Sequence, residues 1–193
     1  MTHAQHDVNV TGIENLINPV GGYVSGKIFH DADIYEQELQ TVWQKTWVFL
    51  AHDSMLPKKG NYIQTYIGED PVIVCRQKDG SVKAFLNQCR HRGMRICRAD
   101  RGLAKGFMCS FHGWAYGLDG TLLDIPHEDT AYPQGMDKTK LSAIQVPRIE
   151  NYNGFIFGSW DENIPPLEEY LGNAKYYLDG YLDRYAGGME AIA

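Results

Sequence analysis

Two short segments of the chain carry the side chains best suited to bind a metal. The first holds a Cys-x-His pair, Cys89 and His91, and the second holds a Cys-x-x-His pair, Cys109 and His112. The intervening residues 92–108 leave enough chain for two loops to approach one point from opposite sides. Thiolates suit iron–sulfur clusters and zinc, while imidazole suits both iron and zinc. The four side chains are therefore predicted to bind a metal centre.

The distribution of the donors separates two kinds of centre. One Cys and one His in each segment matches a [2Fe–2S] centre in which two His replace two Cys on one iron. A Cys₂His₂ zinc site is the alternative, but its usual spacing keeps the two Cys together and the two His together. Cys97 lies between the segments and is a further candidate ligand. We expect it instead to be a small apolar residue of the core, as free Cys usually is.

The residues around the donors carry a resemblance to a known family. The two segments read C-R-H-R-G over residues 89–93 and C-S-F-H-G-W-A-Y-G over residues 109–117. This pattern resembles the Rieske motif in the large (alpha) subunit of bacterial aromatic-ring-hydroxylating dioxygenases. Residues 85–98 are similar to the toluene/biphenyl, polycyclic and salicylate oxygenase branches, and the resemblance covers most of residues 28–190. It implies that Cys89 and Cys109 bind one iron and that His91 and His112 bind the other.

The rest of the sequence is expected to be mainly β, with a minor α component. Short β-rich runs at close intervals, separated by Gly and Asp turns, indicate an antiparallel barrel or sandwich. The resemblance implies the Rieske [2Fe–2S] fold, in which antiparallel sheets carry an inserted cluster-binding subdomain. Strands are predicted over residues 47–51, 61–67, 72–75, 82–87, 121–125, 145–150 and 154–158. Residues 102–108 are predicted to form a short strand pair, and residues 151–153 the turn between the last two strands.

Two helices are expected to flank the strands. Asp31 or Asp33 can cap a helix that begins near Ile34, and its apolar residues at helical spacing predict one buried stripe. Pro165-Pro166 opens a second helix over residues 166–182. The predicted stripe of the first helix comprises Tyr35, Leu39, Val42 and Trp43, and that of the second comprises Leu167, Tyr170, Leu171, Ala174, Leu178 and Tyr181. The chain is therefore divided into an N-terminal arm at 1–27, a Rieske domain with its leading helix at 28–160, and a C-terminal helix with the start of a further domain at 161–193.

Composition narrows the class of protein. The 193 residues are 44% hydrophobic and 22% charged, as is ordinary for a globular protein. A net charge of -6 argues against general affinity for nucleic acid. No apolar run reaches membrane-spanning length and the N-terminus is polar, so we expect a cytoplasmic protein. In that reducing compartment no disulfide is expected between Cys75 and Cys97.

Charge is distributed unevenly along the chain. Residues 90–105 carry six cations against a single acid, Asp100. A solvated or salt-bridged face is one interpretation. The other is a docking surface for an acidic electron donor, because complementary charge accelerates association. The cations are Arg90, Arg92, Arg95, Arg98, Arg101 and Lys105.

The resemblance implies a function as the Rieske part of a terminal oxygenase alpha subunit. Such a subunit accepts electrons from a ferredoxin or reductase and passes them to a mononuclear Fe(II) that hydroxylates an aromatic compound with O₂. The implied assembly is an alpha-subunit trimer with a small (beta) subunit. No His follows His127, so this chain is expected to be truncated before the second iron site and not to hydroxylate by itself. A free-standing Rieske-type ferredoxin is the alternative, and the two flanking helices favour the oxygenase.

Overall fold

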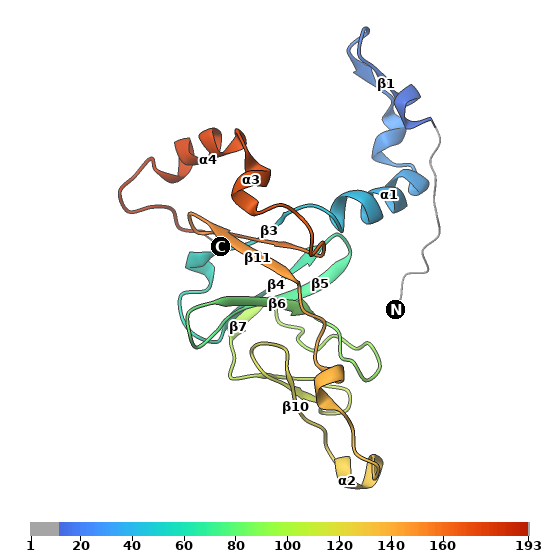
Figure 1. Ribbon diagram of the computed structural model, residues 1–193, viewed down its shortest axis with the longest axis vertical. Helices are drawn as coiled ribbons and strands as arrows, with labels where there is room; N and C mark the ends of the chain where they lie inside the picture. Colours follow the sequence, from blue (N-terminus) through green and yellow to red (C-terminus); the bar gives the residue numbers. More distant parts are fainter. Residues whose placement is uncertain (1–11, 193) are drawn as a thin grey trace.

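The computed structural model describes residues 12–192, shown as a ribbon in Figure 1. Of the predicted N-terminal arm, residues 1–11 lie outside the described part of the chain. The remainder forms a two-stranded hairpin that projects away from the sheets (Figure 1). Its elements are η1 (Ile13–Leu16), β1 (Ile17–Asn18), β2 (Tyr23–Val24) and η2 (Gly26–Phe29).

Two antiparallel sheets form the centre of the fold, as the short β-rich runs separated by Gly and Asp turns predict. The larger sheet has the strand order β6-β5-β4-β7, and the smaller has the order β11-β12-β3. A shared core of aliphatic side chains, among them Leu50, Val72, Val74 and Ile156, fills the space between them. The strands are β3 (Val48–His52), β4 (Asn61–Ile67), β5 (Asp70–Arg76), β6 (Val82–Leu86), β7 (Arg101–Leu103), β11 (Arg148–Tyr152) and β12 (Phe155–Ser159).

A third sheet of short strands, the small sheet, packs on the face of the β6-β5-β4-β7 sheet that is turned away from β11-β12-β3. It consists of β8 (Phe107–Met108), β9 (Ala115–Tyr116) and β10 (Leu122–Asp124), in the order β10-β9-β8. Side chains alternate along a strand, so Ile73 and Cys75 of β5 face this second core while Val72 and Val74 face the first. The buried residues 72–75 of β5 therefore separate two hydrophobic cores, and the lower part of Figure 1 shows the small sheet as an appended layer.

Two details of the predicted strands are wrong. The segment 102–108 does not form a strand pair, because β7 pairs with β4 whereas β8 pairs with β9. The hairpin after residue 148 turns at Asn153-Gly154 rather than at residues 151–153. Both turn residues have positive φ angles, 47° and 94°, as a type I′ turn requires.

The N-terminal helix begins as predicted but does not bury the predicted stripe. Asp31 caps α1 (Ala32–Glu38) by accepting hydrogen bonds from the N–H groups of Asp33 and Ile34, and a π-helical turn, η3 (Leu39–Trp43), follows. Ile34 is the buried residue of α1, whereas Tyr35, Val42 and Trp43 are 46%, 47% and 39% exposed. Among the described residues of α1, Ile34 is therefore the one that is buried, and most of the predicted stripe is exposed.

The predicted second helix is two helices. Gly172, with a φ angle of 48°, separates α3 (Leu167–Leu171) from α4 (Ala174–Leu182). Leu167 and Leu182 pack with Trp47 and Tyr152 into a third core against the smaller central sheet. The other short helices are η4 (Asp53–Met55), α2 (Glu128–Ala131) and η5 (Lys138–Leu141). No helix within residues 12–192 combines the length and the apolar character needed to cross a membrane.

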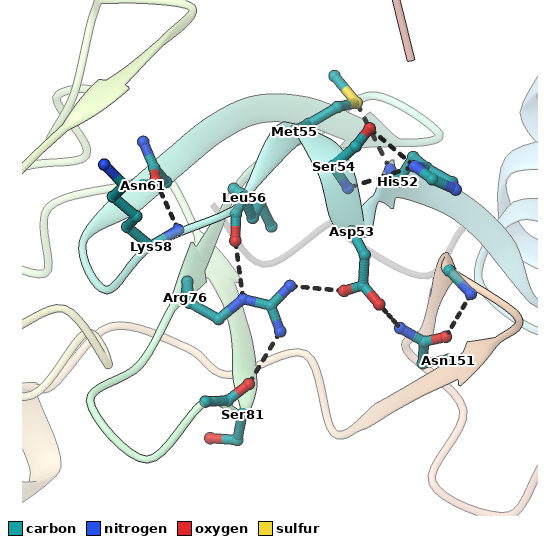
Figure 2. A network of polar contacts seen from close by, with 12 residues as sticks. His52, Asp53, Ser54, Met55, Leu56, Lys58, Asn61, Arg76, Ser81 and Asn151 are labelled. Carbon is teal, nitrogen blue, oxygen red and sulfur yellow. Dashed lines mark hydrogen bonds and ion pairs between the residues drawn. The ribbon is translucent and has the colours of Figure 1, made fainter. Parts of the chain in front are cut away.

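An arginine at the end of β5 ties the two central sheets together (Figure 2). Arg76 donates hydrogen bonds to the carbonyls of Leu56 and Gly80, at 2.9 and 2.8 Å, and pairs with Asp53 at 2.5 Å. The second carboxylate oxygen of Asp53 accepts a hydrogen bond from Asn151 at 2.7 Å. The guanidinium thus joins the end of β5 to residues 53–56, which follow β3, and to the turn before β6, and Asp53 extends the network to Asn151 of β11.

Candidate metal centre

The two predicted ligand segments have the same backbone design. The carbonyl of Cys89 accepts from the N–H of Gly93, and the N–H of Cys89 donates to the carbonyl of Met94, both at 2.8 Å. The carbonyl of Cys109 accepts from Gly113, and its N–H donates to Trp114, both at 2.9 Å. The offsets of four and five residues are identical, although the His lies two residues after Cys89 and three after Cys109. Each loop is therefore a closed turn of equal length.

A glycine closes each turn in a conformation that other residues avoid. Gly93 and Gly113 both have a φ angle of 75°. This left-handed region costs a residue with a Cβ roughly 1 kcal/mol or more, whereas glycine enters it freely. A Cβ on Gly113 would also lie 2.8 Å from the Pro126 ring. The positive φ angle needed where each turn closes explains why Gly93 follows His91 by two residues and Gly113 follows His112 directly.

The thiols form the buried end of the centre. Cys89 and Cys109 are 3% and 2% exposed, and the Cys109 thiol lies near enough to contribute to raising the pKa of Cys89. Burial raises the pKa of the Cys89 thiol, while the Tyr116 hydroxyl and the N–H of His91 oppose that rise. The Tyr116 oxygen lies 3.3 Å from the Cys89 sulfur and accepts a hydrogen bond from the N–H of Arg90 at 3.1 Å. A metal that binds here displaces thiol protons.

The imidazoles form the solvent-facing end. The Nδ1 atoms of His91 and His112 lie 3.1 Å apart, so the same ring nitrogen of each His points to one place. Burial and the neighbouring His112 and Arg92 lower the pKa of His91, which favours the neutral, ligating form of the ring. His112 is exposed. The Nε2 atoms remain available for groups beyond the centre.

Aromatic rings hold the two imidazoles differently. The ring of Trp114, itself 3% exposed, stacks on His91 with centroids 4.9 Å apart and planes 10° apart. Phe111, which is 53% exposed, packs on His112 at 3.9 Å with planes 31° apart. His91 is therefore held by a buried partner and His112 by a surface one.

Two further polar residues at the centre are not apparent from the metal-binding pattern. Asn87 is fully buried, and its side chain bonds to both the N–H and the carbonyl of Cys97. Tyr116 is 1% exposed and contacts Cys89 through its hydroxyl. The sequence signals that could have identified them are weak. Asn87 lies at a strand end two positions before Cys89, and Tyr116 lies seven positions after Cys109. Cys97 lies apart from the four donors, half-buried, with its thiol on the Ala99 carbonyl.

The donor set fits a binuclear centre. The four candidate ligands lie as a pair of thiols and a pair of imidazoles. Sulfur on one iron and nitrogen on its neighbour is the ligand distribution of a Rieske [2Fe–2S] cluster.

The chain is similar to known oxygenase subunits. It is 49% identical over 184 residues to the benzene 1,2-dioxygenase subunit alpha of Pseudomonas putida, and 48% identical over 180 residues to the biphenyl 2,3-dioxygenase subunit alpha of Rhodococcus jostii. These matches cover 95% and 93% of the chain but only 40% and 39% of the relatives. The solved structure of naphthalene 1,2-dioxygenase with indole bound in the active site matches with a TM-score of 0.82 at 43% identity, covering 86% of this chain and 37% of that one.

The family model for the Rieske [2Fe-2S] domain matches residues 46–150, which include both ligand loops, the β6-β5-β4-β7 sheet and the β10-β9-β8 sheet. This match spans more than half of the 193 residues. It agrees with the antiparallel sheets, the appended small sheet and the paired thiols and imidazoles. The chain therefore belongs to the Rieske [2Fe-2S] domain family.

Proposed function

We propose that this chain is the electron-transfer part of the alpha subunit of an aromatic-ring-hydroxylating dioxygenase. Cys89 and Cys109 bind one iron of the [2Fe–2S] cluster, and His91 and His112 bind the other. When bound, the cluster accepts one electron and returns it. The pairing of thiol with thiol and imidazole with imidazole in two matched turns is the observation that carries this assignment.

The burial of the ligands suits electron exchange with a partner. The thiol end lies in the second hydrophobic core, where water is excluded from the sulfur atoms. The imidazole end lies at the surface, where a redox partner can approach. Trp114 keeps the plane of His91 fixed, so the ligand geometry needs little rearrangement when the charge of the centre changes.

The proposal for the whole protein rests on its relatives. We assign it a ferredoxin or reductase as electron donor, a mononuclear Fe(II) beyond these residues as acceptor, an aromatic compound as substrate, and an alpha-subunit trimer with a beta subunit as assembly. The names of the relatives, dioxygenase subunits for benzene and biphenyl, support the aromatic substrate. We place the protein in the cytoplasm, where thiols remain reduced, and its four cysteines are free.

A spectroscopic experiment tests the ligand assignment. The chain is purified under anaerobic conditions, its iron and acid-labile sulfide are quantified, and electron paramagnetic resonance is recorded after reduction with dithionite. We expect two irons and two sulfides per chain and the spectrum of an iron pair with nitrogen ligands. His112→Ala should abolish this spectrum because one iron loses a ligand.

Matched variants and metal content give the controls. His30→Ala removes an exposed imidazole outside the loops and should leave the spectrum unchanged. An unchanged spectrum in His112→Ala would remove His112 from the ligand set. A colourless preparation with stoichiometric zinc and no sulfide would identify the zinc alternative instead. A stand-alone ferredoxin would give the same spectrum, and an Asp-x-x-His-type iron motif downstream in the reading frame would exclude it.

A further inference from the structure

The cations of residues 90–105 are not neutralised by the fold. All six are exposed. Within residues 12–192 the ion pairs of the structure involve other cations, namely Arg76, Lys138, Lys140, Arg148 and Lys175. The interpretation of this stretch as a salt-bridged face is therefore not supported among the described residues. The six exposed cations form a strongly positive surface on a chain whose net charge is -6.

One face of β4 holds this positive segment in place. Every second side chain of a strand projects to the same side, and on β4 these include Tyr62, Gln64 and Tyr66. Tyr62 packs beside Cys97, and the Gln64 side chain donates to the Ala99 carbonyl at 2.9 Å. The backbone N–H of Gln64 also donates, at 2.6 Å, to the carbonyl of the adjoining Asp100.

A buried amide strengthens the same attachment. The Asn87 side chain donates to the Cys97 carbonyl at 2.8 Å and accepts from the Cys97 N–H at 2.9 Å. It also donates to the Gln64 side chain at 2.5 Å. Because Asn87 lies two residues before Cys89, one amide fixes both the approach to the first ligand loop and the segment that follows it.

Tyr66 orients the cation in the middle of the segment. The Arg95 guanidinium lies 5.5 Å from the centroid of the Tyr66 ring and donates a hydrogen bond to its hydroxyl at 2.7 Å. These contacts remove freedom from a long side chain that would otherwise sample many rotamers. The other N–H groups of Arg95, which is exposed, can meet a carboxylate without that ordering loss.

The positive segment adjoins the candidate metal centre at both ligand loops. Arg92 is exposed and follows His91 directly. Arg98 lines a surface groove of about 340 Å³ together with Ser110, the neighbour of Cys109. Exposed Leu103 and Met108, at 69% and 67%, line the same groove and supply apolar contact area. A protein bound here would lie next to both the thiol and the imidazole loops.

We propose that residues 90–105 form a pre-organised docking surface for the carboxylate-rich face of a protein electron donor, with Tyr66 and the Asn87–Gln64 pair as its positioning residues. The inference rests on the proposed electron-transfer function. Complementary charge draws the donor to the centre, and the fixed side chains spare the complex the entropy of ordering them.

The test measures how fast the cluster-loaded chain is reduced. The probe is a reduced plant-type [2Fe–2S] ferredoxin, an acidic protein, mixed in a stopped-flow instrument at several ionic strengths. Arg95→Gln should lower the second-order rate constant about fivefold at low salt and flatten its salt dependence, because one charge is removed. Tyr66→Phe should lower it about threefold with the salt dependence retained, because the charge stays and only its orientation is lost.

Controls separate docking from the cluster itself. Tyr176→Phe changes a tyrosine that is 79% exposed on α4 and should match the parent chain. Reduction by methyl viologen radical at high ionic strength, where salt screens the surface charges, should be equal in all variants. Tyr66→Phe equal to the parent would overturn the positioning role. If Arg95→Gln and Arg101→Gln both had the rate constant of the parent while the Rieske spectrum was present, the docking surface would be overturned and the proposed function upheld. Absence of that spectrum in the parent would overturn the function itself.

Discussion

At the scale of single residues, the two loop glycines have the same conformation but different surroundings. Gly93 and Gly113 share a φ angle of 75°. A Cβ on Gly93 would meet the flexible end of Gln88 at 3.4 Å, whereas one on Gly113 would meet the rigid ring of Pro126 at 2.8 Å. The second loop therefore has a steric constraint, absent from the first, in addition to the backbone constraint they share.

This difference predicts unequal effects of one substitution. Gly93→Ala should lower the free energy of unfolding by about 1 kcal/mol, because alanine is strained at positive φ. Gly113→Ala should lower it by about 2 kcal/mol or more, because the proline ring or the loop must also shift. Urea unfolding and the iron content per chain measure the two effects. Equal losses in both variants would contradict the steric argument.

At the scale of elements, the strength of the framework depends on how the strands are joined at their ends. Burial opposes the ionisation of Asp53, but the hydrogen bonds from Arg76 and Asn151 outweigh it and lower the pKa of this carboxyl. An aspartate with a lowered pKa stabilises the fold above its unfolded pKa, and this stabilisation is lost as the pH falls through the folded value. The network in Figure 2 should therefore weaken in acid.

Asp53→Asn tests this network. The variant keeps the shape of the side chain and removes its charge, so it should unfold at pH 7 with about 0.5–1 kcal/mol less free energy than the parent; the partial exposure of the pair limits the effect. The difference should shrink as the pH falls below 3.8, the unperturbed value for aspartate. Urea unfolding at a series of pH values measures it. A difference independent of pH would show that shape rather than charge holds the junction.

At the scale of the whole molecule, the chain has three cores of unequal strength. The core between the central sheets is supported by strands of five to seven residues. The core that contains Cys89 and Cys109 is covered by strands of only two or three residues. Strands this short carry little stability by themselves, so the small sheet depends on its attachment to β5 and on the metal centre.

Removal of iron should therefore affect one part of the chain. After chelation under reducing conditions, amide hydrogen exchange should accelerate in residues 89–125 and change little in β4 and β5. The physical reason is that metal binding supplies stability only to the loops it joins. Exchange that accelerates equally in both sheets would mean that the cores unfold as one unit.

The sequence predicted most accurately what depends on neighbouring residues. The run Asn61–Ile67 is the strand it was predicted to be, because its period of two is a property of the strand itself. The cap at Asp31 is likewise local. The four candidate ligands were likewise chosen by type and spacing, and the structure places thiol beside thiol and imidazole beside imidazole, while their role as ligands stays a prediction.

Only the tertiary structure decided which distant segments meet. The attachment of β7 to β4, the contact of Tyr66 with Arg95 and the burial of Asn87 against Cys97 each join residues that local patterns treat as unrelated. The outward stripe of α1 and the break at Gly172 also depend on what each helix packs against. Such contacts arise from the balance of burial and hydrogen bonding over the whole fold, whereas residue type and spacing encode only the local terms of that balance.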